Sequence, residues 1–406
     1  MRAVITASVA RGKVHAPPSK SMAHRLLISA MLAEGESRIR GISVCDDVLA
    51  TIDCMRALGV YAEICEGDAI VRGINMKRIS PTSPLPCRES GSTLRFLIPI
   101  AMLCGMCVSF RGSSGLMSRP LSVYEELARE KGLGFLSDTE SITVKGPLTA
   151  GDYFVVGNVS SQFISGLLFA LPLLKKTSRI HITPPIESRP YIDMTIQALS
   201  AFGVKASWED EHTLLIPGGQ KYLPADIEVE GDYSAAAFIE ALNLFGGEAE
   251  VDGLYEDSLQ GDRAYRKYFK QLELGTPTIH IGDCPDLGPI LFAVAAAKNG
   301  GIFSGTRRLK IKESDRAAAM AEELTKFGAS VTVYDDKVVV YPADFHAPEE
   351  RLLGHNDHRI VMAMAVLCSI TGGELVGVEA INKSYPDFFR HLTSLGIGVK
   401  EYEDNL

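Results

Sequence analysis

One pattern recurs six times along the chain and constrains its fold more than any other feature. A short polar segment is followed by an apolar stretch of about three helical turns, a strand-like run, a second helix and a glycine turn into a further strand. The six polar segments begin at Pro18, Glu89, Asn158, Glu230, Asp283 and His355. Four copies close on a triplet such as Leu58-Gly59-Val60.

The length of this repeat points to a small α/β subdomain. Units of about 70 residues are too long for the repeats of a solenoid. Alternating runs such as Arg179-Ile180-His181-Ile182 and Val331-Thr332-Val333-Tyr334 predict short strands between the helices. The pattern therefore predicts an α/β protein in which sheets lie outside and apolar helices are buried.

The polar start of each long helix allows two interpretations. Ser, Asp and Asn cap helix N-termini, and capping suffices for the fourth copy, which carries Asp232 and Ser234. Elsewhere a cation accompanies the cap, such as Arg25, Arg95 or Arg359. Because the N–H groups at a helix N-terminus attract anions, the pattern favours a pocket for small polyanionic molecules.

The composition narrows the class of partner. With 46% hydrophobic residues, the 406-residue chain can bury large cores, which excludes a disordered or fibrous protein. The net charge of −9 argues against a nucleic-acid partner, because such binding depends on neutralising phosphates. No apolar run predicts a membrane span, since polar residues interrupt 153–174 and the run 96–110 is too short.

The cysteines and the N-terminus indicate a cytoplasmic protein. Eight scattered cysteines fit reduced thiols, and Met1-Arg2-Ala3-Val4-Ile5-Thr6 lacks the features of a signal peptide. Cys104 and Cys107 form the only CxxC pair, without a second Cys or His pair nearby. We therefore interpret both as small buried hydrophobes and expect no metal site.

Six short motifs occur in a fixed order and carry a family resemblance. They are Pro17-Pro18-Ser19-Lys20-Ser21-Met22-Ala23-His24-Arg25, Glu89-Ser90-Gly91-Ser92-Thr93-Leu94-Arg95, Ser118-Arg119-Pro120, Ser160-Ser161-Gln162, Lys310-Ile311-Lys312-Glu313-Ser314-Asp315-Arg316 and Asn356-Asp357-His358-Arg359, with Lys383 downstream. In this order the chain resembles the enolpyruvyl transferases, and among them the 5-enolpyruvylshikimate-3-phosphate synthases. The resemblance spans almost the whole chain.

The resemblance implies a fold that agrees with the six copies. It is a two-domain inside-out α/β barrel, each domain made of three βαβαββ units around a pseudo-threefold axis. By analogy the chain crosses between the domains twice. This predicts a discontinuous domain of residues 1–18 plus 232–406, on the phosphoenolpyruvate side, and an inserted domain of residues 19–231, on the shikimate 3-phosphate side.

The resemblance also implies the reaction. The carboxyvinyl group of phosphoenolpyruvate would pass to the 5-hydroxyl of shikimate 3-phosphate, by addition and elimination through a tetrahedral intermediate in the cleft between the domains. It implies that the enzyme needs no metal or organic cofactor and that it is a monomer whose domains close on the substrates. It also implies that glyphosate inhibits the enzyme.

Residue roles follow from the same resemblance. It assigns catalysis to Lys20, Asp286, Glu313 and His358. It assigns contacts to shikimate 3-phosphate to Lys20, Ser21, Arg25, Ser160, Ser161, Gln162, Ser188, Tyr191, Asp286 and Lys312. It assigns contacts to phosphoenolpyruvate to Lys20, Gly91, Arg119, Gln162, Arg316, Arg359 and Lys383.

Plainer interpretations of some of these residues stay open. Lys312 and Arg316 are spaced as an i, i+4 pair on a solvated helix start. Two positions also depart from the family pattern: Glu89 stands where Asn is commoner, and Arg308 lies near a position that is neutral or acidic in many relatives.

Two other functions compete with this one. A sister enolpyruvyl transferase acts on UDP-N-acetylglucosamine, but it carries a reactive Cys on the loop before its Arg-Pro, and the loop 112–120 here has none. A ring-shaped binding module of repeated α/β units, such as a DNA clamp, would need a basic inner surface and no paired carboxylates.

Overall fold

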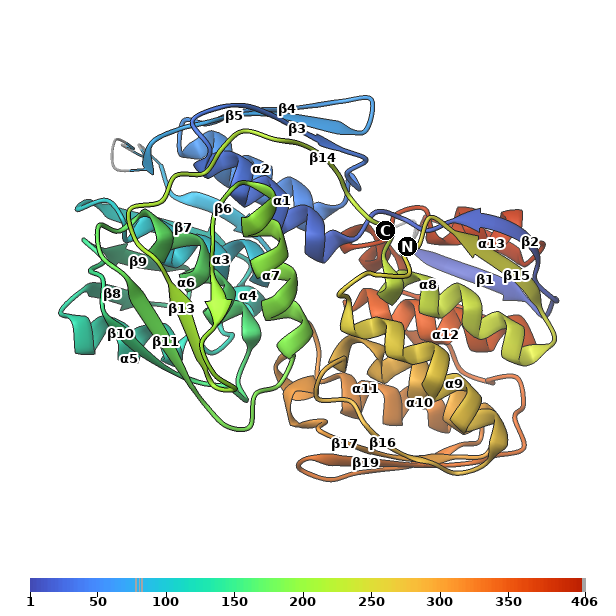
Figure 1. Cartoon of the computed structure of the whole chain (residues 1–406). Helices are drawn as coiled ribbons and strands as arrows, with labels where there is room; N and C mark the ends of the chain where they lie inside the picture. The colour runs from blue at the N-terminus through green and yellow to red at the C-terminus, as the bar shows by residue number, and fades with distance from the viewer. Residues whose placement is uncertain (77–78, 80, 82, 404–406) are drawn as a thin grey trace. The chain divides into compact units, whose positions relative to one another are not determined.

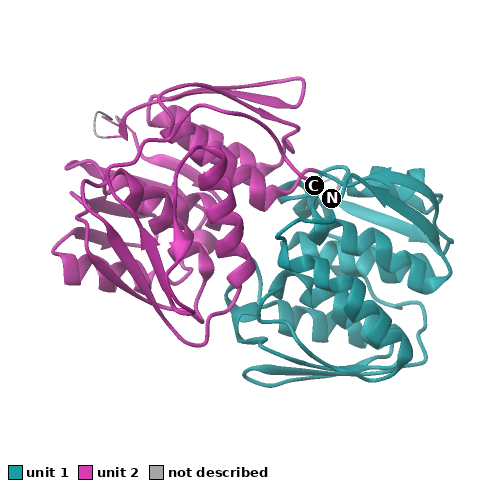
Figure 2. Cartoon of the chain, viewed as in Figure 1, with its two compact units in different colours: residues 1–17, 231–406 teal, residues 18–230 magenta. Residues whose placement is uncertain are grey.

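The computed structural model describes the chain except for residues 77, 78, 80, 82 and 404–406. It forms two compact units, unit 1 of Met1–Pro17 and Gly231–Leu406 and unit 2 of Pro18–Glu230 (Figure 2). Both boundaries fall one residue before those of the predicted domains 1–18 plus 232–406 and 19–231. Each unit has its own hydrophobic core, made entirely of its own residues.

Unit 2 is built from three four-stranded sheets with one common arrangement. In each sheet the first two strands are parallel and the others antiparallel. In strand order they are β14 (Asp226–Glu228), β3 (Gly35–Arg40), β5 (Asp68–Gly73) and β4 (Tyr61–Cys65); β6 (Leu85–Arg88), β7 (Cys107–Gly112), β9 (Ser141–Lys145) and β8 (Gly134–Ser137); and β10 (Asp152–Val156), β11 (Ser178–Thr183), β13 (Thr213–Ile216) and β12 (Ser207–Trp208).

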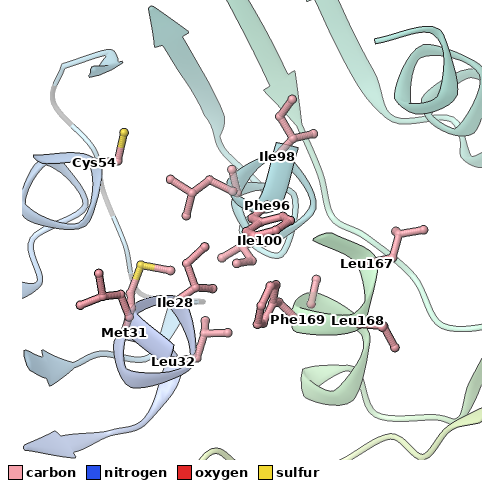
Figure 3. Packing of buried hydrophobic residues seen from close by; sticks show 14 of the residues in the cluster. Ile28, Met31, Leu32, Cys54, Phe96, Ile98, Ile100, Leu167, Leu168 and Phe169 are labelled. Atoms are coloured by element: carbon pink, nitrogen blue, oxygen red, sulfur yellow. The ribbon is translucent and has the colours of Figure 1, made fainter. Parts of the chain in front are cut away.

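One helix from each copy of the repeat fills the interior of this unit. They are α1 (Lys20–Leu32), α3 (Gly91–Ala101) and α6 (Ser161–Ala170), each buried along nearly its whole length, as all-round apolar helices must be. Figure 3 shows their side chains meeting, with the rings of Phe96 and Phe169 5.5 Å apart. The other helices are α2 (Asp46–Ala57), α4 (Ser114–Met117), α5 (Ser122–Lys131) and α7 (Arg189–Ala201).

Unit 1 follows the same plan with one shortened copy. Its four-stranded sheets are β20 (Leu352–Leu353), β21 (Gly373–Val376), β1 (Arg2–Thr6) and β22 (Gly398–Tyr402), and β16 (Thr278–His280), β17 (Gly301–Ser304), β19 (Lys337–Tyr341) and β18 (Ser330–Val333). The third sheet has only two strands, β15 (Glu248–Asp252) and β2 (Arg11–His15).

The interior helices of unit 1 are equally apolar. They are α8 (Tyr233–Glu240), α10 (Gly288–Ala297) and α12 (His358–Thr371). Figure 1 shows the sheets of both units on the outside and these helices within, as the sequence predicts. The remaining helices are α9 (Tyr265–Leu274), α11 (Arg316–Thr325) and α13 (Phe388–Ser394).

At the two crossings of the chain, the first strands of two copies of the repeat change places between the units. β2 precedes α1 in sequence but pairs with β15 in unit 1, whereas β14 precedes α8 but pairs with β3 in unit 2. Backbone bonds fix each crossing, from Ser19 N to Glu230 O (2.7 Å) in unit 2 and from Asp232 N to Pro17 O (2.8 Å) in unit 1. Neither unit is therefore complete without chain from both sides of the crossings.

Side chains cap five of the six interior helices that the structure describes. The capping oxygens belong to Ser19, Ser90, Ser160, Asp232 and Asp357. The exception is α10, which follows the 3₁₀ helix η5 (Pro285–Leu287) and has no side-chain cap. The caps fix where each helix begins, and the candidate site residues lie close to these starts.

The cysteine interpretation needs one correction. None of the eight cysteines forms a disulfide. Cys104 is buried as predicted, but Cys107 is exposed. It begins β7, whose side chains alternate between the core and the outer face. None of the described helices is long and apolar enough to cross a membrane.

A glycine at the closest helix contact provides a test of this packing. A Cβ on Gly166 would lie 2.2 Å from the Tyr124 hydroxyl and 2.5 Å from the Arg95 carbonyl oxygen. We expect Gly166→Ala to lower the free energy of unfolding by about 1–3 kcal/mol, measured by urea denaturation. Gly105→Ala is the control, because no atom lies within 4 Å of its added Cβ. Equal stability of the two variants would contradict this packing.

Candidate active site

In unit 1 one carboxylate is surrounded by three cations. Asp286 lies in η5, and its Oδ1 accepts hydrogen bonds from Lys312 Nζ at 3.0 Å and from Arg316 Nη1 at 2.8 Å. Its Oδ2 accepts a bond from Arg359 Nη2 at 3.2 Å. Three cations from two segments of the chain, residues 312–316 and the start of α12, therefore converge on one side chain.

Arg316 is the most deeply buried of these cations, at 1% exposure. Its Nε donates to Asp357 Oδ2 at 2.8 Å and its Nη2 to Glu313 Oε2 at 2.7 Å. Burial disfavours the charge, but the carboxylates of Asp357, Glu313 and Asp286 outweigh burial and raise the pKa of Arg316. The guanidinium is thus a permanent cation bonded to three carboxylates.

The same contacts fix the charge of the central carboxylate. Burial disfavours ionised Asp286, but Arg359, Lys312 and Arg316 hold the pKa of its carboxyl well below the ordinary value. Asp286 is therefore ionised at neutral pH and can accept a proton. Burial lowers the pKa of the Lys312 ammonium, against the opposing effect of Asp286.

Arg359 is held from two sides near the start of α12. Its Nη1 donates to Ser234 Oγ at 2.6 Å, and its backbone N–H donates to the capping carboxylate of Asp357 at 2.9 Å. Burial opposes its charge, but Asp286 raises the pKa of Arg359. Asp357 thus both caps α12 and binds Arg316, and it ties two of the site arginines together.

The alternative that Lys312 and Arg316 form a solvated pair on one helix is wrong. α11 begins at Arg316 and is capped by Asp315, so Lys312 lies before the helix. Both cations donate to Asp286, which compensates the charge of the buried Arg316 guanidinium and of the partly buried Lys312 ammonium.

The segment before α12 adopts an unusual conformation. His355 and Asn356 have φ values of 49° and 52°, in the left-handed region that side chains disfavour. The Asn356 carbonyl accepts a bond of 2.6 Å from Lys383 Nζ. His358 is 1% exposed, with Nδ1 4.0 Å from Asp357 Oδ1. The structure thus places Lys383 against this segment and His358 beneath it.

In unit 2, a glycine opens α3 against two arginines. A Cβ on Gly91 would lie 2.9 Å from Arg95 Nη1, 3.0 Å from Arg119 Nη1 and 3.9 Å from Gln162 Oε1. Arg95 Nη1 donates to Gln162 Oε1 at 2.8 Å, and Gln162 Nε2 donates to Ser92 Oγ at 2.8 Å. The guanidinium and amide groups therefore lie so close to Gly91 that this arrangement requires a residue without a side chain, and such donors suit a compact anion.

Arg25 is a buried cation held by neutral groups. It is 2% exposed, and its guanidinium donates to Ser21 O at 2.6 Å, Tyr191 O at 2.9 Å and Thr195 Oγ1 at 2.9 Å. It also lies over the Phe96 ring, 5.2 Å from the centroid. No carboxylate among the described residues pairs with it, and burial lowers the pKa of Arg25 to about 10.

Lys20 begins α1 and forms an ion pair that the sequence did not predict. Its Nζ donates to Asp47 Oδ2 at 2.7 Å, with side-chain exposures of 13% and 12%. Asp47 lies in the first turn of α2, so the pair joins the N-terminal ends of two helices.

The remaining predicted residues of unit 2 stand at two helix starts. Ser160 caps α6 through a bond from Gln162 N at 3.3 Å, and Ser161 is buried as the first helical residue. Ser188 precedes α7 with φ 57° and is 3% exposed. The Tyr191 carbonyl binds Arg25, which connects the start of α7 to α1.

A buried hydrogen-bond chain lies beneath these helix starts. His24 Nδ1 lies 2.7 Å from Thr51 Oγ1, Thr51 Oγ1 lies 2.7 Å from Thr93 Oγ1, and Thr93 Oγ1 donates to Ser90 Oγ at 2.7 Å. The chain joins α1, α2 and α3. Burial, with the charges of Lys20 and Arg25, lowers the pKa of His24 to about 3, so the imidazole is neutral.

Four residues at the clusters received no catalytic or substrate-binding role from the family resemblance, although Arg95 was predicted as a cation beside a helix cap and Ser234 as a cap. Arg95 and Asp357 lie inside motifs already singled out, so their motifs were the available signal. Asp47 and Ser234 pair with Lys20 and Arg359, residues 27 and 125 positions away, and no local pattern marks such pairs.

One group of side chains has the composition of a metal site. Ligand atoms of Glu322, Glu323 and His355 lie within 4.8 Å of one another. However, Lys326 Nζ lies 3.0 and 2.9 Å from the two carboxylate oxygens of Glu323. An ammonium therefore already holds the position of a cation, and we assign Glu323, Lys326 and His355 to an ion-pair network.

Comparisons with known proteins give the context for these clusters. Residues 5–392 match the family described as EPSP synthase (3-phosphoshikimate 1-carboxyvinyltransferase). The chain is 38% identical to the 3-phosphoshikimate 1-carboxyvinyltransferase of Clostridium perfringens (strain 13), over 98% of this chain and 99% of that protein. It is 37% identical to the enzyme of the same name from Clostridium kluyveri, over 96% of each chain.

Solved structures share the fold. An EPSP synthase from Acinetobacter baumannii superposes with a TM-score of 0.78 at 23% identity, covering 98% of this chain and 100% of that one. The enolpyruvyl transferase NikO from Streptomyces tendae gives a TM-score of 0.80 at 14% identity, covering 98% of each chain. They confirm the predicted fold class, a two-domain inside-out α/β barrel.

The neutral state of His24 predicts a pH dependence of stability. The imidazole of the unfolded chain takes up a proton below about pH 6.5, whereas buried His24 stays neutral down to about pH 3. Its contribution is therefore complete above pH 6.5 and is lost as the pH falls toward 3. We expect His24→Asn, which keeps a partner for Thr51, to remove this dependence.

Urea denaturation from pH 7.5 to 4.5 measures the effect. The difference in unfolding free energy between the wild-type protein and the variant should change by up to about 1.4 kcal/mol per pH unit. A difference that does not vary with pH would show that His24 takes up its proton at the same pH in the folded protein as in the unfolded chain.

Proposed function

This chain belongs to the EPSP synthase family, and on that premise we propose that it transfers the carboxyvinyl group of phosphoenolpyruvate to the 5-hydroxyl of shikimate 3-phosphate and releases phosphate. This reaction is a step of the shikimate pathway, which leads to the aromatic amino acids. Both substrates are small and polyanionic. The site must therefore hold anions and move protons.

The observation that carries the proposal is the environment of Arg25. A buried charge is costly unless a charge of opposite sign compensates it, and the described partners of Arg25 are neutral oxygens and rings. A phosphate dianion is a bidentate partner for a guanidinium. We assign this anion to the phosphate of shikimate 3-phosphate, with the hydroxyls of Ser21, Ser160 and Ser161 as further donors. Ser188 and Tyr191 at the start of α7 complete this assignment.

Phosphoenolpyruvate is assigned to the glycine of α3 and to the arginines around it. The absence of a side chain at Gly91 lets Arg119 and Gln162 lie close to the start of α3, where we place the anion. In unit 1, Arg316 and Arg359 supply preformed cations, with Lys383 as a further contact.

The ionised state of Asp286 suits a base. The positive charges around it keep its carboxyl deprotonated, so it can accept the proton of the 5-hydroxyl as the oxygen attacks C2 of phosphoenolpyruvate. Lys312, which binds the same carboxylate, then neutralises charge near shikimate 3-phosphate.

The second proton moves at the methylene carbon. Addition forms the C2–O bond and protonates C3; elimination removes a proton from C3 as the C2–O bond to phosphate breaks. We assign this proton to Glu313, which must carry it when it acts as the acid in the addition and which takes a proton back as the base in the elimination. Glu313 Oε2 is 2.7 Å from Arg316 Nη2. We assign to Lys20 and His358 the role of neutralising the charge of the phosphates. We also infer that the protein is a monomer and acts in the cytoplasm.

A coupled phosphate-release assay tests the function against its nearest rival. We expect release from phosphoenolpyruvate with shikimate 3-phosphate as acceptor and none with UDP-N-acetylglucosamine. Lys20→Met should lower turnover by about 100-fold or more with an unchanged circular dichroism spectrum. Turnover with the UDP-sugar alone would refute the assignment, and a fully active Lys20→Met variant would refute the role of Lys20.

The close approach of two arginine side chains to Gly91 gives a further prediction. The methyl group of Gly91→Ala would meet the ends of two arginine side chains, which can move, so the variant should fold. We expect the KM for phosphoenolpyruvate to rise about tenfold, equivalent to about 1.4 kcal/mol of binding, and inhibition by glyphosate to weaken with it. Gly115→Ala, whose Cβ would lie 3.8 Å from Ser113 Oγ, is the control. An unchanged KM in Gly91→Ala would remove phosphoenolpyruvate from this position.

A further inference from the structure

α11 carries a buried carboxylate that the proposed mechanism does not use. Glu323 is 0% exposed. Its carboxylate oxygens accept bonds from the Leu353 backbone N–H at 2.9 Å and from His355 Nε2 at 2.8 Å. Lys326 Nζ donates to both oxygens, at 3.0 and 2.9 Å, and also to Arg351 O at 3.1 Å. A buried carboxylate with this many donors is a fixed anchor point.

The anchor acts on the segment that carries site residues. Arg316 and Glu323 are seven residues apart on α11, which is about two turns and places them on one face of the helix. Arg316 binds Asp357, and Glu323 binds Leu353 and His355. α11 therefore holds both ends of the short connection between β20 and α12.

That connection is strained and closely packed. Two consecutive residues without glycine's freedom, His355 and Asn356, adopt positive φ. Such conformations persist only where the surroundings over-determine them. Gly354 allows no slack, because its added Cβ would lie 2.7 Å from Val361 Cγ2 and 2.8 Å from Gly377 O. The carbonyl of Asn356 in turn binds Lys383.

We propose that Glu323 and His355 are positioning residues. Their hydrogen bond holds the strained connection and so orients the side chains of Asp357, His358 and Arg359, which stand at the start of α12. This inference rests on the proposed function, in which Arg359 binds phosphoenolpyruvate. The tie reaches the site through the backbone of residues 355–357, and neither Glu323 nor His355 contacts the reacting atoms.

His355→Gly is the first variant of the test. The side chain is 20% exposed and glycine adopts φ 49° freely, so the fold should be kept. We expect the amides of residues 359–361, which bond to Asp357, to exchange hydrogen about tenfold faster than in the wild-type protein. The kcat/KM for phosphoenolpyruvate should fall by about 10- to 100-fold, mainly through KM.

Two matched variants separate the tie from other effects. His355→Asn also tolerates the left-handed region but is too short to reach Glu323, so it should behave like His355→Gly. Glu322→Gln removes a charge from the exposed side of the same turn and should behave like the wild-type protein. Normal exchange and KM in His355→Asn, or equal defects in Glu322→Gln, would overturn the proposal.

The amide-exchange measurement needs no substrate and keeps the two proposals apart. A wild-type protein that releases no phosphate from the two substrates would refute the proposed function alone. Unchanged exchange at residues 359–361 in both His355 variants would refute the positioning role, whatever the activity.

Discussion

Buried positive charge is the constraint on which both clusters depend, and the two units meet it differently. In unit 1, Arg316 is enclosed by the carboxylates of Asp286, Glu313 and Asp357. In unit 2, Arg25 is held by backbone oxygens, a hydroxyl and a ring. Carboxylates stabilise a buried guanidinium fully, whereas neutral oxygens leave it with an unused attraction for anions. The two clusters therefore differ in whether carboxylates of the protein compensate the charge of the central guanidinium.

Helix caps fix the positions of the functional groups in these clusters. Gly91 follows the cap Ser90, Gln162 follows the cap Ser160 by two residues, and Arg359 follows the cap Asp357 by two. A side chain near the first turn of a rigid helix has little freedom, so the position of the cap sets the position of the functional group. The apolar bodies of these helices are buried in their units, which fixes their axes.

Much of this could be predicted from the sequence, and the rest could not for physical reasons. Six apolar helices and their polar starts were evident, because periodicity and caps are local signals. The exchange of β2 and β14 between copies was not, because strand pairing across more than 180 residues leaves no local trace. The same holds for Asp47, which resembles any acidic residue in a first helical turn until Lys20 is placed beside it.

Strained backbone conformations also occur at the helix starts that carry the candidate site residues. Five non-glycine residues in the described chain have positive φ, and Glu66 is the only one in a simple hairpin turn, between β4 and β5. The other four, Arg88, Ser188, His355 and Asn356, all lie within three residues of the start of α3, α7 or α12. Strain costs stability and persists where surrounding contacts hold it, so its position before these helices shows that their direction is fixed by more than the helices themselves. The Glu323–His355 bond is one such contact, and it fixes the helix start that carries Arg359.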